Sequence, residues 1–361
     1  MGPDSLNVAI IAGLVAVAAA AATAWSWDRI RRWWRWPMRA VAVSLCLAAA
    51  AAVAAVAVNR ELELYTTWSE VSRGEQLATD GALEGAEATP ADRRGSRIVR
   101  FVVPGRSSGI TMASYAYLPL GYDSAPQVRY PVVEVLDGFP GSPHSWLKGL
   151  RAQEVLDQEI AAGRMAPTVV VFPYQTPDPT HDTQCVDAVG GLRIDTFLTS
   201  DVRAAVAALV RVRTDRAGWG LIGYSEGGFC VANLALRHPN LYAAAASLSG
   251  YFEPPTAALM GDLFRGDVRI RNLNSPLWRM RNLAPAAVAL YAACSRDDRQ
   301  SVEQIQQLAA TVRPPLRLTT SFVAQGGHTA ITWRALEPLA FDWLSSWLAA
   351  PQPVVATPRP A

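Results

Sequence analysis

The stretch Gly218–Cys230, GWGLIGYSEGGFC, carries the strongest structural signal in the sequence. Its first half is apolar and rich in β-branched and aromatic residues, which is typical of a short strand buried on both faces. The apolar run stops at Ser225, and Gly223 and Gly227 flank this serine symmetrically. The residues after it have a helical pattern. We therefore expect a sharp strand-to-helix turn with Ser225 at its tip.

Similar apolar runs alternate with helix-like segments over residues 97–350. The alternation predicts an α/β fold, a mainly parallel sheet with helices on both faces. The other expected strands are Arg97–Gly105, Ile110–Tyr122, Tyr130–Gly138, Pro167–Tyr174, Tyr242–Phe252, Ala287–Ser295 and Leu316–Gly327. The expected helices are Gly149–Gly163, Thr196–Val212, Gly227–His238, Ser301–Val312 and Ala330–Ala349.

Two longer apolar segments, 7–25 and 40–58, precede this domain. Each is close to the roughly 20 residues needed to cross a membrane. The loop between them is rich in arginine, which favours the cytoplasm, and in tryptophan, which suits the membrane interface. The sequence predicts a two-helix transmembrane hairpin over 1–60 and an extracytoplasmic domain. A cleaved signal peptide is the alternative for the first segment, but MGPDSLN lacks a basic start.

The remaining segments are polar or rich in proline. Residues 61–96 have little periodicity and are expected to form a linker. The tail 351–361, PQPVVATPRPA, is expected to be disordered. The formal net charge of the 361 residues is +2, which argues against a nucleic-acid partner.

Gly-Tyr-Ser-Glu-Gly matches the G-x-S-x-G nucleophile elbow, with the strand before it and the helix after it that this motif requires. The helix N-terminus then directs amides and the positive end of its dipole toward developing negative charge. Ser225 is therefore the candidate nucleophile. The alternative is a structural Gly/Ser turn.

A serine needs a base, and the chain has four histidines. In α/β-hydrolases the order is serine, then acid, then histidine. His238 ends a helix in RHPN, so His328 is the preferred base. Asp297 and Asp298 both follow the strand expected to carry the acid. Asp298 is preferred, and the other aspartate would be a loop residue or a helix N-cap.

An oxyanion hole needs two amide donors, and this motif class takes one from the residue after the nucleophile, here Glu226. The second is expected from Phe139 in LDGFPGSPHSW, the loop after Tyr130–Gly138. The alternative is a Gly/Pro turn without substrate contact. The chemistry needs no cofactor. The four cysteines lack the close paired spacing of a zinc site, so no metal is expected.

The motifs LDGFPG, GYSEGGFC, SLSGYF and GGHTAITW, in this order, resemble the putative esterase family of α/β-hydrolases, which includes esterase D-type enzymes and secreted mycolyltransferase antigens. The resemblance covers about residues 97–348. It implies an eight-stranded-type hydrolase sheet, a triad of Ser225, Asp298 and His328, and the amides of Phe139 and Glu226 as oxyanion donors.

The chain departs from the mycolyltransferases at two positions of these motifs. Glu226 stands where they have methionine, and Phe139-Pro140 replaces a segment with a charged residue. The resemblance therefore does not extend to their sugar-acceptor site. Trp333, shortly after the histidine, is open to two interpretations, a lining of the acyl pocket or a core residue of the last helix.

The resemblance and the expected compartment also suggest a disulfide between Cys185 and Cys230, because disulfides persist outside the cytoplasm. Cys294 would then stay free, although a bridge to it instead remains open. Cys46 lies within a predicted membrane span.

Together these features predict a membrane-anchored, extracytoplasmic serine esterase or acyltransferase that acts on a small-molecule or lipid ester. The sequence does not choose between water and an alcohol, such as one of the cell envelope, as the acyl acceptor. The alternatives are a non-catalytic scaffold with a hydrolase fold and a peptidase with the same triad.

Overall fold

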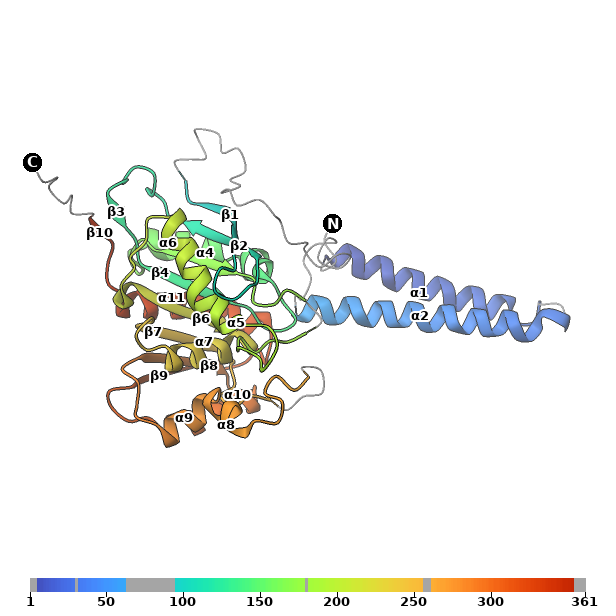
Figure 1. Cartoon of the computed structure of the whole chain (residues 1–361). Coiled ribbons are helices and arrows are strands. Elements are labelled where there is room, and N and C mark those ends of the chain that lie inside the picture. The colour runs from blue at the N-terminus through green and yellow to red at the C-terminus, as the bar shows by residue number, and fades with distance from the viewer. Residues whose placement is uncertain (1–4, 30–31, 63–94, 179–180, 256–260, 354–361) are drawn as a thin grey trace, which may run out of the picture. The chain divides into compact units, whose positions relative to one another are not determined.

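The structure is a computed structural model that describes residues 5–29, 32–62, 95–178, 181–255 and 261–353 (Figure 1). Most of the predicted linker 61–96 lies outside these residues. The chain divides into two units, residues 1–75 and 76–361, which we describe separately.

The first unit consists of two packed helices, α1 (Leu6–Ser26) and α2 (Arg35–Leu62), joined through a short turn, η1 (Arg32–Trp34). Ser5 caps α1, because its hydroxyl accepts a hydrogen bond from the amide of Val8. Leu6–Ser26 and Arg35–Asn59 are both long and apolar enough to cross a membrane. The predicted segments 7–25 and 40–58 lie within these two helices.

The second unit is built on an eight-stranded sheet in the order β1-β2-β5-β4-β6-β7-β8-β9. The pairs β1–β2 and β2–β5 are antiparallel, and all the other pairs are parallel. The predicted fold class is therefore confirmed. The strands are β1 (Arg97–Val103), β2 (Met112–Leu118), β4 (Val132–Leu136), β5 (Val169–Pro173), β6 (Trp219–Tyr224), β7 (Ala244–Leu248), β8 (Ala289–Ser295) and β9 (Arg317–Val323).

Helices cover both faces of this sheet (Figure 1). One core packs Phe197, Phe229 and Ile305 against the sheet, and the other packs Leu156 and Phe341. Every residue of β4, β6, β7 and β8 is buried, which explains why these strands read as continuous apolar runs. The helical segments are η3 (Ser145–Gly149), α4 (Ala152–Ala161), α5 (Ile194–Thr196), η4 (Phe197–Val202), α6 (Arg203–Leu209), η5 (Arg216–Gly218), α7 (Glu226–Arg237), α8 (Val268–Leu273), α9 (Pro276–Asn282), α10 (Arg299–Ala309) and α11 (Ala330–Trp347).

The structure differs from the sequence-based expectations in three places. The short helices α8 and α9 were not expected, because neither is long enough to show a helical repeat. The helix expected over Thr196–Val212 is composed of α5, η4 and α6. Within the tail expected to be disordered, Gln352–Pro353 forms β10, which pairs with β3 (Val128–Arg129). Arg213 also holds this part of the tail, because its guanidinium donates to Gln352 Oε1 at 2.8 Å.

Candidate active site

Ser225 occupies the turn between β6 and α7, with φ 54° and ψ −118°. A positive φ is unfavourable for a residue with a side chain, so packing around the turn must hold it. Its glycine neighbours allow this packing. A Cβ on Gly223 would lie 2.3 Å from the carbonyl oxygen of Gly227, and one on Gly227 would lie 2.2 Å from that of Leu136. The turn therefore holds the serine half-buried at the tip of the strand.

His328 lies in the loop between β9 and α11, and its imidazole joins Ser225 to Asp298. His328 Nε2 is 2.9 Å from Ser225 Oγ, and His328 Nδ1 is 2.8 Å from Asp298 Oδ2. Burial alone would raise the pKa of Asp298. The hydrogen bonds from His328 and Ser301 outweigh this effect and hold the pKa below its ordinary value. Asp298 is therefore an ionised, buried partner for the imidazole.

Asp297 has a different set of partners. It accepts hydrogen bonds from the backbone amides of Gly326 at 3.2 Å and Gly327 at 2.8 Å, and from the hydroxyl of Ser295. The Ser295 and Gly327 hydrogen bonds are the largest causes that hold the pKa of Asp297 below its ordinary value. Of the two candidate acids, the structure thus places Asp298 at the imidazole and Asp297 at the backbone before it.

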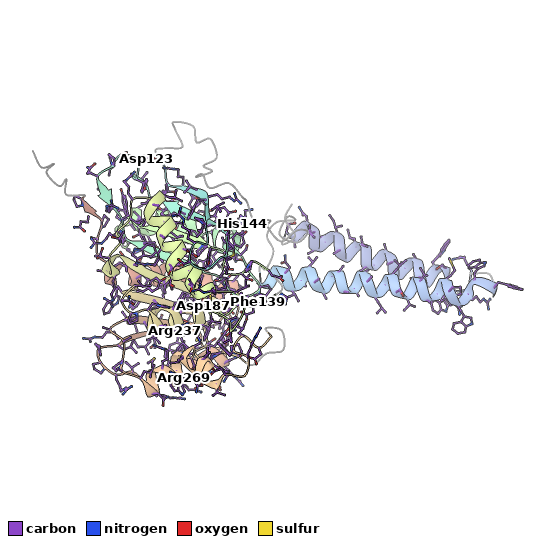
Figure 2. The ribbon with its side chains drawn as sticks, in the orientation of Figure 1. Asp123, Phe139, His144, Asp187, Arg237 and Arg269 are labelled. Atoms are coloured by element: carbon purple, nitrogen blue, oxygen red, sulfur yellow. A yellow bond between two sulfur atoms is a disulfide. The ribbon has the colours of Figure 1, made fainter. Side chains whose placement is uncertain are left out.

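Phe139 and Glu226, the two expected oxyanion donors, both line the cavity that Ser225 also lines. Glu226 is the first residue of α7, where helix amides have no intrahelical acceptor. Phe139 follows β4, and Figure 2 labels it. In the described part of the chain, neither amide donates a hydrogen bond to the protein. Gly138 brings this loop close, because a Cβ there would lie 3.1 Å from the Cβ of Ser225.

A disulfide joins Cys185 to Cys230 on α7. It ties the loop that carries Asp182 to the helix that follows Ser225. The carboxyl group of Glu226 lies close to both sulfur atoms. Because the sulfurs are bonded to each other, they are not the thiolates that a metal ion would require.

The other two cysteines, Cys46 and Cys294, are free. Burial raises the pKa of the Cys294 thiol to about 12, which makes it a poor nucleophile at neutral pH.

Two further histidines, His238 and His144, have other partners. His238 is the C-cap of α7, and its Nε2 is 2.7 Å from Asp195 Oδ1. The helix-end role expected for it is thus confirmed. The Nε2 of His144 is 3.4 Å from the hydroxyl of Tyr115.

Trp333 is a core residue that also touches the site. It is 4% exposed and stacks on Tyr224, with ring centroids 4.2 Å apart. The ring of His328 meets it edge-on at 5.5 Å. Trp333 does not line the cavity beside Ser225, so the core interpretation fits this structure.

A cavity of about 450 Å³ opens beside Ser225. The sequence did not point to most of its lining, because α8 and the loop before it carry no motif. The lining residues are Phe139, Asp182, Ser225, Glu226, Tyr251, Glu253, Pro254, Pro255, Arg271, Gln300 and Gln304. The cavity is thus large enough for a small ester, and most of its lining side chains are polar.

The fold and this arrangement define an α/β-hydrolase with a serine, a histidine and an aspartate in hydrogen-bond contact. A model of the family described as "Putative esterase" matches residues 106–313. The chain therefore belongs to this family, as the sequence motifs indicated.

The similar proteins include an uncharacterized protein of Corynebacterium glutamicum, 25% identical over 271 residues. The match covers 71% of this chain and 63% of that relative, so the chain spans less than two thirds of the relative's length. A ferulic acid esterase structure has a TM-score of 0.62 at 19% identity, covering 71% of this chain and 99% of the other. An S-formylglutathione hydrolase from Agrobacterium tumefaciens has a TM-score of 0.61 at 14% identity, covering 71% and 97%. These two structures establish the shared fold.

Proposed function

We propose that this protein is a membrane-anchored serine esterase or acyltransferase whose active domain lies outside the cytoplasm. The observation that carries the proposal is the continuous hydrogen-bonded path from Ser225 through His328 to Asp298, with contacts of 2.9 Å and 2.8 Å. Membership in an esterase family supports an ester as the substrate.

In the first step, Ser225 Oγ attacks the ester carbonyl while His328 Nε2 takes its proton. Asp298 accepts the hydrogen bond from Nδ1–H, which fixes the tautomer and stabilises the imidazolium that forms. The carbonyl oxygen becomes an oxyanion, and the amides of Phe139 and Glu226 donate hydrogen bonds to it. The N-terminal end of α7 adds favourable dipole potential at the same place.

In the second step, the imidazolium returns its proton to the leaving alcohol, and an acyl group remains on Ser225. A water or an acceptor alcohol then gives its proton to His328 and attacks the acyl carbonyl. The bond between the acyl carbon and Ser225 Oγ then breaks, and His328 returns the proton to Ser225. Water gives a carboxylic acid and an alcohol gives a new ester, so acceptor access decides between hydrolase and transferase.

The helices α1 and α2 supply the proposed anchor. The sequence between the two apolar segments carries five arginines, at positions 29, 31, 32, 35 and 39, which favour a cytoplasmic loop. A helical hairpin with its loop inside places the following domain outside. The Cys185–Cys230 disulfide supports this topology, because disulfides persist in oxidising compartments.

The test uses the full chain in detergent with 4-nitrophenyl butyrate, with and without glycerol. We expect turnover by the native protein and a loss of about 10³-fold or more in Ser225→Ala. Glyceryl butyrate among the products would mark acyl transfer. Turnover that persists in Ser225→Ala would contradict the proposal.

A membrane-impermeant fluorophosphonate tests the topology. It should label the protein in intact cells as strongly as in lysed cells. Labelling only after lysis would place the domain in the cytoplasm.

A further inference from the structure

The cavity beside Ser225 brings together two chemically different groups of side chains. Asp182 and Glu226 are carboxyl groups that are almost completely buried. Arg271 of α8 and Gln304 of α10 are half-buried and carry hydrogen-bond donors. The hydrogen bonds that each side chain already makes within the protein determine which of its donors and acceptors remain for a ligand.

The two buried acids lie close enough to influence each other. Burial, followed by the negative charge of the nearby Asp182, raises the pKa of Glu226 well above its ordinary value and so disfavours its charged form. Asp182 accepts hydrogen bonds from the backbone amide of Gln184 at 2.8 Å and from its side-chain amide at 3.1 Å. Both Asp182 oxygens are therefore already used within the protein, whereas Glu226 Oε2 has no hydrogen-bond partner among the described residues.

Arg271 carries a positive charge and uses few of its hydrogen-bond donors within the protein. One of its terminal nitrogens, Nη2, donates to the carbonyl oxygen of Pro254 at 2.6 Å, which anchors the side chain. No carboxylate of the described residues forms an ion pair with it. A guanidinium has five N–H donors and a permanent charge, so most of its binding capacity remains.

Gln304 extends this donor surface. Its Oε1 accepts a hydrogen bond from the backbone amide of Phe252 at 2.9 Å. The acceptor of this side chain is thus used, and its NH₂ group is what remains for a ligand. Arg271 and Gln304 are both anchored on the segment Phe252–Pro254, so their positions are set before a ligand binds.

We propose that the substrate carries an anionic oxygen group, a carboxylate or a phosphate, which binds Arg271 and the amide of Gln304 while its ester carbonyl lies at Ser225. This inference rests on the proposed function and names its substrate class. Guanidinium groups recognise such anions through paired, charge-assisted hydrogen bonds. The anion can belong to the acyl half or to the alcohol half of the ester.

Glu253 allows a test of whether charge in the cavity determines the preference for an anionic ester. It also lines the cavity, is exposed, and lies next to the residue that anchors Arg271. Its negative charge opposes an anionic ligand. Removing this charge should therefore strengthen the preference that Arg271 provides.

The first experiment compares 4-nitrophenyl hydrogen adipate with its methyl ester, in which a methyl group removes the charge of the free carboxylate, and follows the release of 4-nitrophenol from both. The full chain in detergent is assayed as native protein and as Arg271→Gln, Arg271→Lys and Glu253→Gln. The matched control is Arg269→Gln, because Arg269 is exposed on the same helix and does not line the cavity (Figure 2). A second pair, acetoxyacetic acid and its methyl ester, places the charge on the alcohol half.

For at least one pair, the native protein should prefer the anionic ester in kcat/KM. Arg271→Gln should reduce this preference about tenfold and leave the neutral ester within about twofold. Arg271→Lys should keep part of the preference, Glu253→Gln should increase it, and Arg269→Gln should match the native protein. The pair that responds identifies the half of the ester that carries the anion.

The inference is overturned if the native protein and Arg271→Gln show the same preference for the anionic over the neutral ester in both pairs, provided that the neutral esters are still hydrolysed. Failure of the proposed function looks different, because then the native protein would hydrolyse neither neutral ester and a fluorophosphonate would not label it. The fluorophosphonate labelling rate and the melting temperature also report whether Arg271→Gln is folded. If this variant is unfolded, Arg271→Lys and Glu253→Gln decide, and an unchanged preference in both contradicts the inference.

Discussion

His328 Nδ1 lies 2.8 Å from Asp298 Oδ2, while the neighbouring carboxylate of Asp297 faces the backbone that leads to the same histidine. Two consecutive aspartates after β8 therefore hold one histidine in two ways. Asp298 contacts the imidazole, and Asp297 holds the loop through the amides of Gly326 and Gly327.

Asp298→Asn should abolish most of the activity while the fold is retained. The amide would favour the wrong imidazole tautomer and would not stabilise the imidazolium, so we expect kcat to fall by about 10³- to 10⁴-fold. Steady-state kinetics with a chromogenic ester and a thermal melt check this. Native-like turnover in a folded Asp298→Asn protein would exclude Asp298 as the partner of His328.

Asp297→Ala should act through the position of His328. Loss of the two amide contacts loosens the loop, and we expect kcat to fall about ten- to hundredfold with little change in KM. Asp297→Asn keeps an oxygen that can accept one of these amides, so it should recover part of the rate. If both variants lose equal activity, or if KM carries the effect, the loop-positioning role is wrong.

The main features of the site could be predicted from the sequence because they follow from local rules. The G-x-S-x-G motif lay between a buried strand and a helix, which identified Ser225. The chain order of α/β-hydrolases then left His328 as the preferred base. The sequence decided less firmly which of Asp297 and Asp298 contacts the histidine, because adjacent residues differ only in which way their side chains point.

These local rules could not predict which residues line the cavity. Arg271 lies on a helix of six residues, too short for a periodic pattern. Asp182 lines the cavity from a loop that the disulfide ties to α7. The strand β10 depends on pairing with β3, far away in the sequence, so Gln352–Pro353 looked like a free tail.

The disulfide should contribute substantially to the stability of the second unit. It closes a loop of 45 residues, for which the loop-closure relation gives about 4 kcal/mol at 25 °C. Replacing Cys185 and Cys230 by serine should lower the melting temperature by several degrees or more, whereas Cys46→Ser, outside this unit, should not.

A thiol count provides an independent check of this pairing. The denatured full chain should show two reactive thiols without reductant and four with it, because Cys46 and Cys294 are free. Four thiols under both conditions would contradict the pairing.

Buried Asp137, at the end of β4, should make stability depend on pH. Burial raises its pKa from 3.8 to about 8. The folded protein thus keeps a proton that the unfolded chain releases above about pH 4. The contribution of Asp137 to stability is therefore greatest below pH 4, falls between pH 4 and 8, and is constant above.

Asp137→Asn removes this titration. Its melting temperature relative to the native protein should rise from pH 5 to pH 8 and then level off. A difference that does not change with pH would show that Asp137 does not titrate in this way.

The most direct test of the central claim is covalent labelling of the full chain with a fluorophosphonate, followed by peptide mass mapping. An activated serine reacts with this probe, whereas an ordinary serine hydroxyl does not. We predict a single adduct on Ser225 that is absent in Ser225→Ala and strongly slowed in His328→Gln. A folded native protein that stays unlabelled, or an adduct on Ser225 that forms equally fast without His328, would contradict the proposed mechanism.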